Sequence, residues 1–143
     1  MKIERFEDLD CWKQARILTG LIYDICENQH VSRDRRLRDQ LTGSAISVMN
    51  NIAEGFGSQS NLEFKRFLNY ARRSVSELQS CLYVASDRKF ISQGDFQVAY
   101  QQSETTRKVI DGMLRYLRSR RLQQTQRTER TQQTQRTERS QRT

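Results

Sequence analysis

Residues 60–85 read SNLEFKRFLNYARRSVSELQSCLYVA, and this stretch decides the fold. Its apolar side chains recur every three or four residues, so at about 100° per residue they fall within an arc of roughly 100° on one side of a helix. These residues are Phe64, Phe67, Leu68, Ala71, Val75, Leu78, Leu82 and Ala85. Ser60 and Glu63 form the S-x-x-E pattern of a capping box at the start. The stretch therefore predicts an amphipathic helix that buries one face.

Three more helices follow from the same spacing of apolar residues. The first covers residues 9–28. The second runs from the N-cap Asp34 to Gly55, where we expect the GFG run at residues 55–57 to supply the left-handed residue that closes the helix. The last begins after Ser92. The chain has no proline and six glycines, so little interrupts these helices. Short connections force antiparallel neighbours, and the connection that contains His30 is expected to be a loop. The sequence predicts an all-α, up-down-up-down four-helix bundle over residues 1–122.

The last 21 residues have a different composition. Residues 123–143 read QQTQRTERT, then QQTQRTERS, then QRT, without one apolar side chain. A segment with nothing to bury does not offset the entropy lost on ordering. We therefore predict a disordered C-terminal tail over residues 123–143.

Charge and cysteine content indicate a class of partner and a compartment. The net charge is +8, from 25 Lys plus Arg against 17 Asp plus Glu. This balance favours polyanionic partners such as nucleic acid, although it fits ordinary solubility equally well. The three cysteines have no C-x-x-C spacing and are expected to be reduced, and neither a signal peptide nor a membrane-spanning run is found. A cytoplasmic protein without membrane contact is expected.

Nothing in the sequence matches an active site. The one histidine and three scattered cysteines do not make a zinc or iron site, and Gly55 and Gly57 follow a helix instead of the strand that precedes a phosphate-binding loop. We expect no metal, no cofactor, no small-molecule substrate and no enzymatic activity.

Basic side chains are expected to line the outer surface of the last two helices. Four lie on the third helix, away from its apolar stripe, and two lie on the fourth. These residues are Lys65, Arg66, Arg72, Arg73, Lys108 and Arg115. They are candidates for a phosphate-binding surface, and a solvated exterior explains the same pattern.

The first two helices carry more apolar surface than one core requires. On the first helix the apolar arc widens to roughly 220° at 100° per residue. The surplus residues are Trp12, Ile17, Leu21, Ile46, Met49 and Ala53. Exposed apolar stripes are typical of an interface between subunits. Alternatively, the N-terminal segment covers Trp12 and Ile46 through Ile3, Phe6 and Leu9.

Three blocks, in order along the chain, carry a family resemblance. They are FEDLDCWKQA at residues 6–15, NIAEGFG at 51–57 and EFKRFL at 63–68. Together they resemble the small proteins encoded in intervening sequences of bacterial 23S ribosomal RNA genes, over about residues 6–117. The chain departs from the family pattern at Met49, where a proline is common, and in the first loop, which lacks Phe-Pro. The nine-residue repeat is also no part of that pattern.

The resemblance implies an antiparallel four-helix bundle that assembles as a homopentamer without an established enzymatic activity. The family is also structurally similar to a basic pentameric accessory protein of diversity-generating retroelements, which binds nucleic acid. Within the second block, Asn51, Glu54 and Gly55 form a structural motif, in which the two polar side chains are expected to hydrogen-bond the loop or a neighbouring subunit. The predicted function is a homo-oligomer that binds RNA or DNA through its basic surface. The alternative is a protein-interaction scaffold that does not bind nucleic acid.

Overall fold

The structure is a computed structural model that describes residues 2–141, apart from the side chains at positions 121 and 122. All the secondary structure in this part of the chain is helical. The elements in order are η1 (Phe6–Asp8), α1 (Asp10–Cys26), α2 (Gln29–Arg33), α3 (Arg35–Gly57), α4 (Asn61–Asp87) and α5 (Gln93–Gln141).

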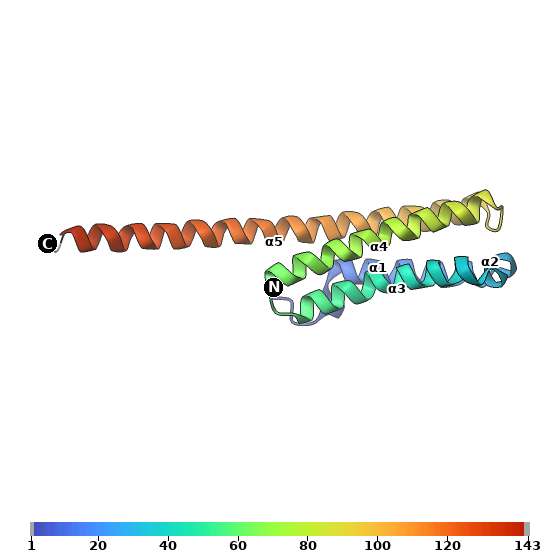
Figure 1. The fold of residues 1–143 in the computed structure, drawn as a ribbon, viewed down its shortest axis with the longest axis horizontal. Coiled ribbons are helices and arrows are strands. Elements are labelled where there is room, and N and C mark those ends of the chain that lie inside the picture. Colours follow the sequence, from blue (N-terminus) through green and yellow to red (C-terminus); the bar gives the residue numbers. More distant parts are fainter. Residues whose placement is uncertain (1, 142–143) are drawn as a thin grey trace.

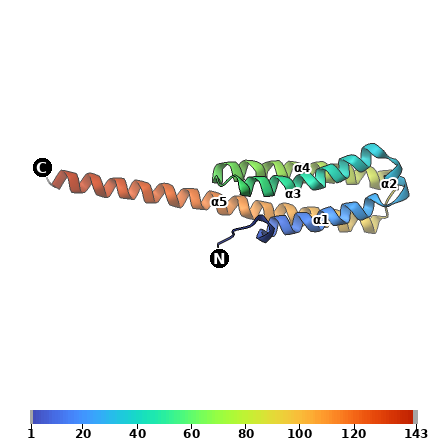
Figure 2. The same ribbon diagram turned by 90° about the horizontal axis from the view of Figure 1, so that it is seen from below.

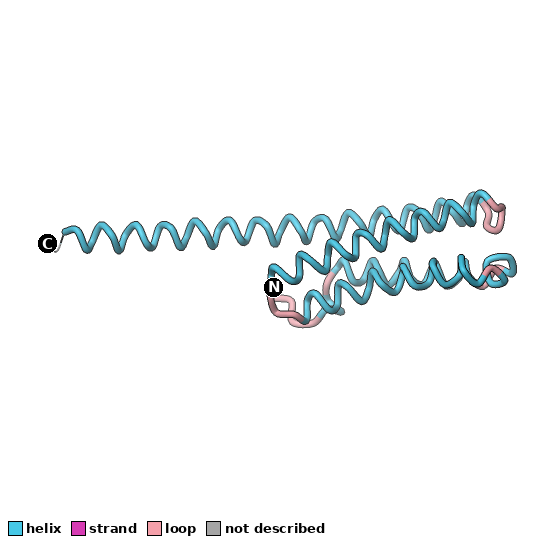
Figure 3. Tube along the Cα trace, viewed as in Figure 1, coloured by secondary structure: helices cyan, strands magenta, loops and turns pink. Residues whose placement is uncertain are grey.

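Four long helices form the bundle, and each runs opposite to the one before it (Figures 1 and 2). Helix α3 packs most extensively on α4, while α1 contacts both α3 and α5, and α5 contacts α4. The all-α prediction is confirmed. The two short helices η1 and α2 were not predicted. They lie in the connections before α1 and before α3, where Figure 3 also shows short loops.

The predicted helix starts are confirmed by their capping bonds. Asp34 Oδ1 accepts a hydrogen bond from the Leu37 N–H at 3.0 Å, and Ser92 Oγ accepts from the Asp95 N–H at 3.0 Å. Ser60 Oγ accepts from the Glu63 N–H at 3.3 Å. Each bond satisfies a backbone donor that has no partner within the helix.

Two local predictions are wrong. Helix α3 does not stop at Gly55 but continues to Gly57, and the left-handed residue of the loop is Gln59, with φ of 57°. Gly55 is instead buried against α4, where a Cβ would lie 2.6 Å from the Cβ of Phe67, so glycine is required for close packing rather than for a turn. His30 lies in α2 instead of a loop, because Asn28 caps this short helix through the N–H groups of residues 30 and 31.

The core runs the length of the bundle as two adjoining clusters. One contains Leu18, Leu41 and Leu78, and the other contains Ile52 and Ile110. The exposed fraction of each of these five side chains is 0%. The apolar faces predicted from periodicity are therefore the faces that pack.

A buried polar network ties α4 to α5. Gln79 Nε2 donates to Ser103 Oγ at 2.9 Å and to Glu104 Oε1 at 2.6 Å, while an Arg107 N–H donates to Gln79 Oε1 at 2.7 Å. Because a buried polar group without a partner costs free energy, this network favours one register of α5 on α4.

The prediction of a disordered tail is wrong for residues 123–141, which extend α5 as a lone helix beyond the bundle (Figure 1, orange to red). Residues 142–143 lie outside the described part of the chain. Elongation of an existing helix requires no new nucleation, and the repeat contains strong helix formers with neither glycine nor proline. Four threonine hydroxyls also bond the carbonyl four residues earlier, each at 2.9 Å. Low hydrophobicity predicts the absence of packing but not the absence of a helix.

Candidate nucleic-acid interface

A cluster of two arginines and a tyrosine lies on the outer face of α4. Arg66, Tyr70 and Arg73 follow one another at spacings of four and three, which places them on one side of the helix. The guanidinium carbon of each arginine lies 5.6 Å from the centroid of the Tyr70 ring. We call these three residues the Arg–Tyr–Arg cluster.

Hydrogen bonding holds the Arg66 side chain in place. Arg66 Nε donates to Tyr70 Oη at 2.8 Å, and Arg66 also lies 3.7 Å from Glu63 Oε1. The bond to Tyr70 is the main cause of a raised Arg66 pKa, with Glu63 contributing less. The cluster therefore presents two exposed cations around a half-buried aromatic ring.

The other predicted basic residues lie where α4 meets α5. Arg72 Nε lies 2.8 Å from Asp111 Oδ1 of α5, an ion pair without hydrogen-bond geometry. Lys108 and Arg115 are exposed and lie three residues before and four residues after Asp111, on the same face of α5. Lys65 is half-buried, seven residues before Arg72. The structure thus gathers all six on adjoining faces of two helices, with the charge of Arg72 partly balanced by Asp111.

Sequence reasoning missed Tyr70. Its spacing of four from Arg66 and three from Arg73 was the available signal, because side chains at those intervals meet on a helix. Two further contacts of this kind, also missed, join Arg120 to Tyr116 and Arg16 to Trp12.

The six predicted interface residues divide equally between α1 and α3, and the three on α1 lie on two sides of that helix. Ile17 and Leu21 lie three and seven residues after Gln14, which Gln102 of α5 contacts, so they flank α5. Trp12 lies seven residues before Thr19, whose hydroxyl bonds the Ala45 carbonyl of α3. The remaining three, Ile46, Met49 and Ala53, lie on α3.

These side chains also differ in exposure. Ile17 is 51% exposed and Ile46 is 38% exposed. Leu21, Met49 and Ala53 are half-buried. Trp12 is half-buried too, with its ring 5.2 Å from that of Phe6, so the N-terminal segment covers one side of it. The two isoleucines are thus the best-placed members of the set to contact a second chain.

The predicted structural motif connects α3 to α4. Asn51 Nδ2 donates to the Ser47 carbonyl at 2.8 Å and to Ser47 Oγ at 3.0 Å, and Ser47 Oγ lies 2.8 Å from Ser74 Oγ of α4. Glu54 is exposed, and Gly55 provides the close approach described above. Asn51 thus bonds its own helix rather than the loop.

The described residues contain no group of three or more His, Cys, Asp or Glu side chains that could hold a metal ion. The three cysteines are free thiols, and burial raises the pKa of Cys11 to about 12, which keeps that thiol protonated and unreactive at neutral pH.

In the described part of the chain, no helix is long and apolar enough to cross a membrane.

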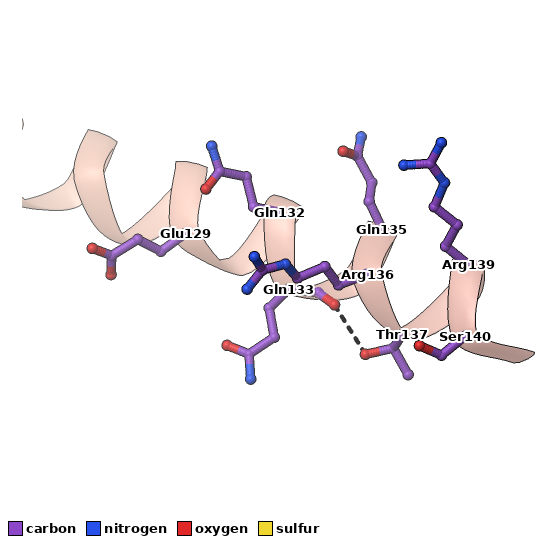
Figure 4. Close-up of a pocket in the computed structure, with 8 residues that line it drawn as sticks. All are labelled: Glu129, Gln132, Gln133, Gln135, Arg136, Thr137, Arg139 and Ser140. Atoms are coloured by element: carbon purple, nitrogen blue, oxygen red, sulfur yellow. Dashed lines mark hydrogen bonds between the residues drawn. The ribbon is translucent and has the colours of Figure 1, made fainter.

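The lone part of α5 adds a second basic region. Arg127, Arg130, Arg136 and Arg139 are all exposed. Figure 4 shows some of the side chains between positions 129 and 140, which project in several directions from one helix, with Gln135 and Arg139 on one side and Gln133 on the other. The hollows between these side chains open directly to solvent, so this region offers a charged convex surface instead of a pocket.

These features define a four-helix-bundle protein with a basic face on α4 and α5 and a long helical extension. The chain belongs to the 23S rRNA-intervening sequence protein family, whose model matches residues 7–112. The match ends before the lone part of α5. None of the curated proteins compared with the chain matches it.

A solved structure has the same fold. It is a protein of unknown function from the S23 ribosomal protein family of Bacteroides thetaiotaomicron, with a TM-score of 0.66 and 19% sequence identity. The match covers 73% of this chain and 97% of the other.

Proposed function

We propose that the protein is a non-enzymatic homo-oligomer, with five subunits in the ring, that binds RNA or DNA through the outer face of α4 and α5. The Arg–Tyr–Arg cluster is the observation that carries the proposal. Arginine binds phosphate through paired N–H donors. Two arginines seven residues apart, whose guanidinium groups lie over the Tyr70 ring between them, supply such contacts on one helix face.

Repetition around a ring strengthens the proposal. Each subunit contributes the cluster together with Lys65, Lys108 and Arg115, so a closed oligomer repeats the positive surface. Summed charge of one sign raises the local concentration of a polyanion and its rate of association. Membership of a family encoded within ribosomal RNA genes is consistent with such a partner but does not identify it.

A salt titration tests the nucleic-acid part. The fluorescence anisotropy of a labelled generic RNA is followed with the wild-type chain and with the double variant Arg66→Gln, Arg73→Gln. Each lost phosphate contact lowers the slope of log affinity against log salt by about 0.7 for a single strand, so the double variant is expected to lose about 1.4.

The matched control removes the same charge from the turn that follows α4. The double variant Arg88→Gln, Lys89→Gln changes two exposed cations and leaves the cluster intact. It should bind nearly as well as the wild type. Equal losses in the two double variants would mean that only net charge matters, and no binding by the wild type at low salt would refute the proposal.

Sedimentation tests the oligomer. The exposed Ile46 is replaced by Asp, which places a charge in the expected apolar contact and so should dissociate the ring. Circular dichroism should remain unchanged, because Ile46 faces away from the core. A wild-type chain that sediments as a monomer would contradict the oligomer directly.

A further inference from the structure

The four described arginines within residues 123–141 follow a single rule. They are exposed and stand at intervals that are multiples of three. They are Arg127, Arg130, Arg136 and Arg139. Gln124 and Gln133 occupy the same row in the repeat. The row is thus made only of arginine and glutamine from Arg127 to Arg139.

A spacing of three does not match the period of an α-helix. With 3.6 residues per turn, each step of three falls about 60° short of a full turn and advances about 4.5 Å along the axis. The arginines therefore wind around the helix and complete a circuit in about 18 residues, or about 27 Å. Figure 4 shows two of these arginines, Arg136 and Arg139, whose side chains point in different directions.

This winding argues against a partner that contacts one side only. A coiled-coil partner requires apolar residues at a period near 3.5 or 3.67, and a membrane surface requires an apolar face. Residues 123–141 contain no apolar side chain to supply either. The partner must therefore be polar, anionic and able to surround much of the helix circumference.

The major groove of duplex DNA meets these conditions. It is about 12 Å wide and admits an α-helix of about 10–12 Å diameter, with phosphates along both walls and base edges on the floor. The groove curves around the DNA, whereas the protein helix is straight. Near its middle the helix therefore contacts the base edges on the floor, and toward its ends it contacts the flanking phosphates with other faces. Arginines that wind around the helix supply a cation on each of these faces.

The arginines and glutamines of the row can also contact base edges on the floor of the groove. Arginine pairs with guanine O6 and N7, and glutamine pairs with adenine N6 and N7. The A-form major groove of duplex RNA is too deep and narrow for side chains to read. The same helix therefore fits duplex DNA better than duplex RNA.

We propose that residues 123–139 of α5 form a preformed helix that binds in the major groove of duplex DNA. The inference rests on the proposed nucleic-acid binding and assigns it a second element and a duplex partner. It also assigns a role to the part of α5 that does not pack in the bundle.

The test uses the full chain with a short duplex DNA, the same sequence as duplex RNA, and the single strand, each followed by fluorescence anisotropy against salt. The main variant changes Arg127, Arg130, Arg136 and Arg139 to Gln, which keeps helix propensity high. We expect the wild type to prefer duplex DNA, and the variant to lose about 3.6 from the salt slope on duplex DNA, at about 0.9 for each contact. Replacing the same four residues with Lys should retain most of the affinity.

A second variant tests the helical conformation of the tail without changing its charge. Thr131→Pro leaves every charge in place but interrupts the helix, because proline lacks the N–H and clashes with the preceding turn. It should weaken binding to duplex DNA and leave binding to the single strand unchanged. Duplex binding that is insensitive to Thr131→Pro would overturn the preformed helix, and a preference for duplex RNA or for the single strand would overturn the major groove.

The two proposals fail in different ways. If the four-arginine variant binds duplex DNA like the wild type while the Arg66, Arg73 variant binds nucleic acid poorly, the tail inference is overturned and the bundle interface stands. If the wild type binds none of the three probes, both proposals are refuted.

Discussion

The two halves of α5 share a backbone conformation but are stabilised by different forces. Residues 93–117 pack Ile110, Leu114 and Leu117 into the core, whereas the described side chains beyond Leu117 are all exposed. In the first half, burial of apolar surface provides most of the free energy, at about 25 cal/mol per Å². In the second half, backbone hydrogen bonds, threonine hydroxyl bonds to the carbonyls of the same helix and intrinsic propensity act, and the helix depends on the first half for nucleation. One helix can thus be part of a core and a lone charged extension.

Substitution by alanine in each half of α5 gives the largest expected contrast in the free energy of unfolding. Leu114→Ala removes a buried side chain and leaves a cavity, so the free energy of unfolding should fall by about 2–5 kcal/mol. Gln133→Ala, in the lone half, should leave it within about 0.5 kcal/mol. Urea unfolding followed by tryptophan fluorescence measures both, since Trp12 is in the bundle. Similar losses in the two variants would mean that the lone half packs on something.

Two of the three glycines of α3, Gly43 and Gly55, give a similar contrast within the bundle. Gly55→Ala places a Cβ 2.6 Å from the Cβ of Phe67, so overpacking should lower the free energy of unfolding by about 1–3 kcal/mol. Gly43→Ala has open space around its Cβ and should raise it by about 0.5–1 kcal/mol, the usual gain within a helix. Thermal unfolding compares the two variants. Stabilisation by both would show that α3 and α4 are further apart at Gly55 than described.

Burial of Cys11 predicts a smaller effect that depends on pH. Its thiol pKa rises from 9.0 to about 12 because of desolvation, so between these values the unfolded chain loses a proton that the folded chain keeps. The free energy of unfolding should therefore fall as pH rises above 9, by at most about 1.4 kcal/mol per pH unit from this group. Other groups titrate in the same window, so the measured quantity is the difference between wild type and Cys11→Ala at pH 8 and pH 10. A difference that does not change with pH would place the thiol in solvent.

The bundle could be predicted from the sequence because the periodicity of its apolar residues encodes it. The faces that contain Leu18, Leu41 and Leu78 are the faces that pack, and the caps at Asp34 and Ser92 form as expected. The end of α3 could not be predicted, because the demand for glycine at position 55 comes from a neighbouring helix and not from the local chain. Close approach of two helices leaves no signal in either sequence alone.

The candidate site was predicted in part. Spacing placed Arg66 and Arg73 on one face, but the contribution of Tyr70 depends on the rotamers of both arginines, and the ion pair of Arg72 depends on the register of α5. The helical tail was missed for a different reason. The polar composition of residues 123–143 predicts disorder, but a helix that only needs to be extended does not require an apolar face.

The state of the lone half is best measured by the ¹³Cα chemical shifts of residues 123–141 in the full chain. The described structure predicts shifts on the helical side of random-coil values throughout this segment, strongest next to the bundle and weaker toward Gln141, where the helix end frays. Thr131→Pro should return the residues around it to random-coil values and leave the shifts of the bundle unchanged. Random-coil shifts over residues 123–141 of the wild-type chain would contradict the account, because they would remove the preformed helix on which the comparison and the inferred DNA contact both rest.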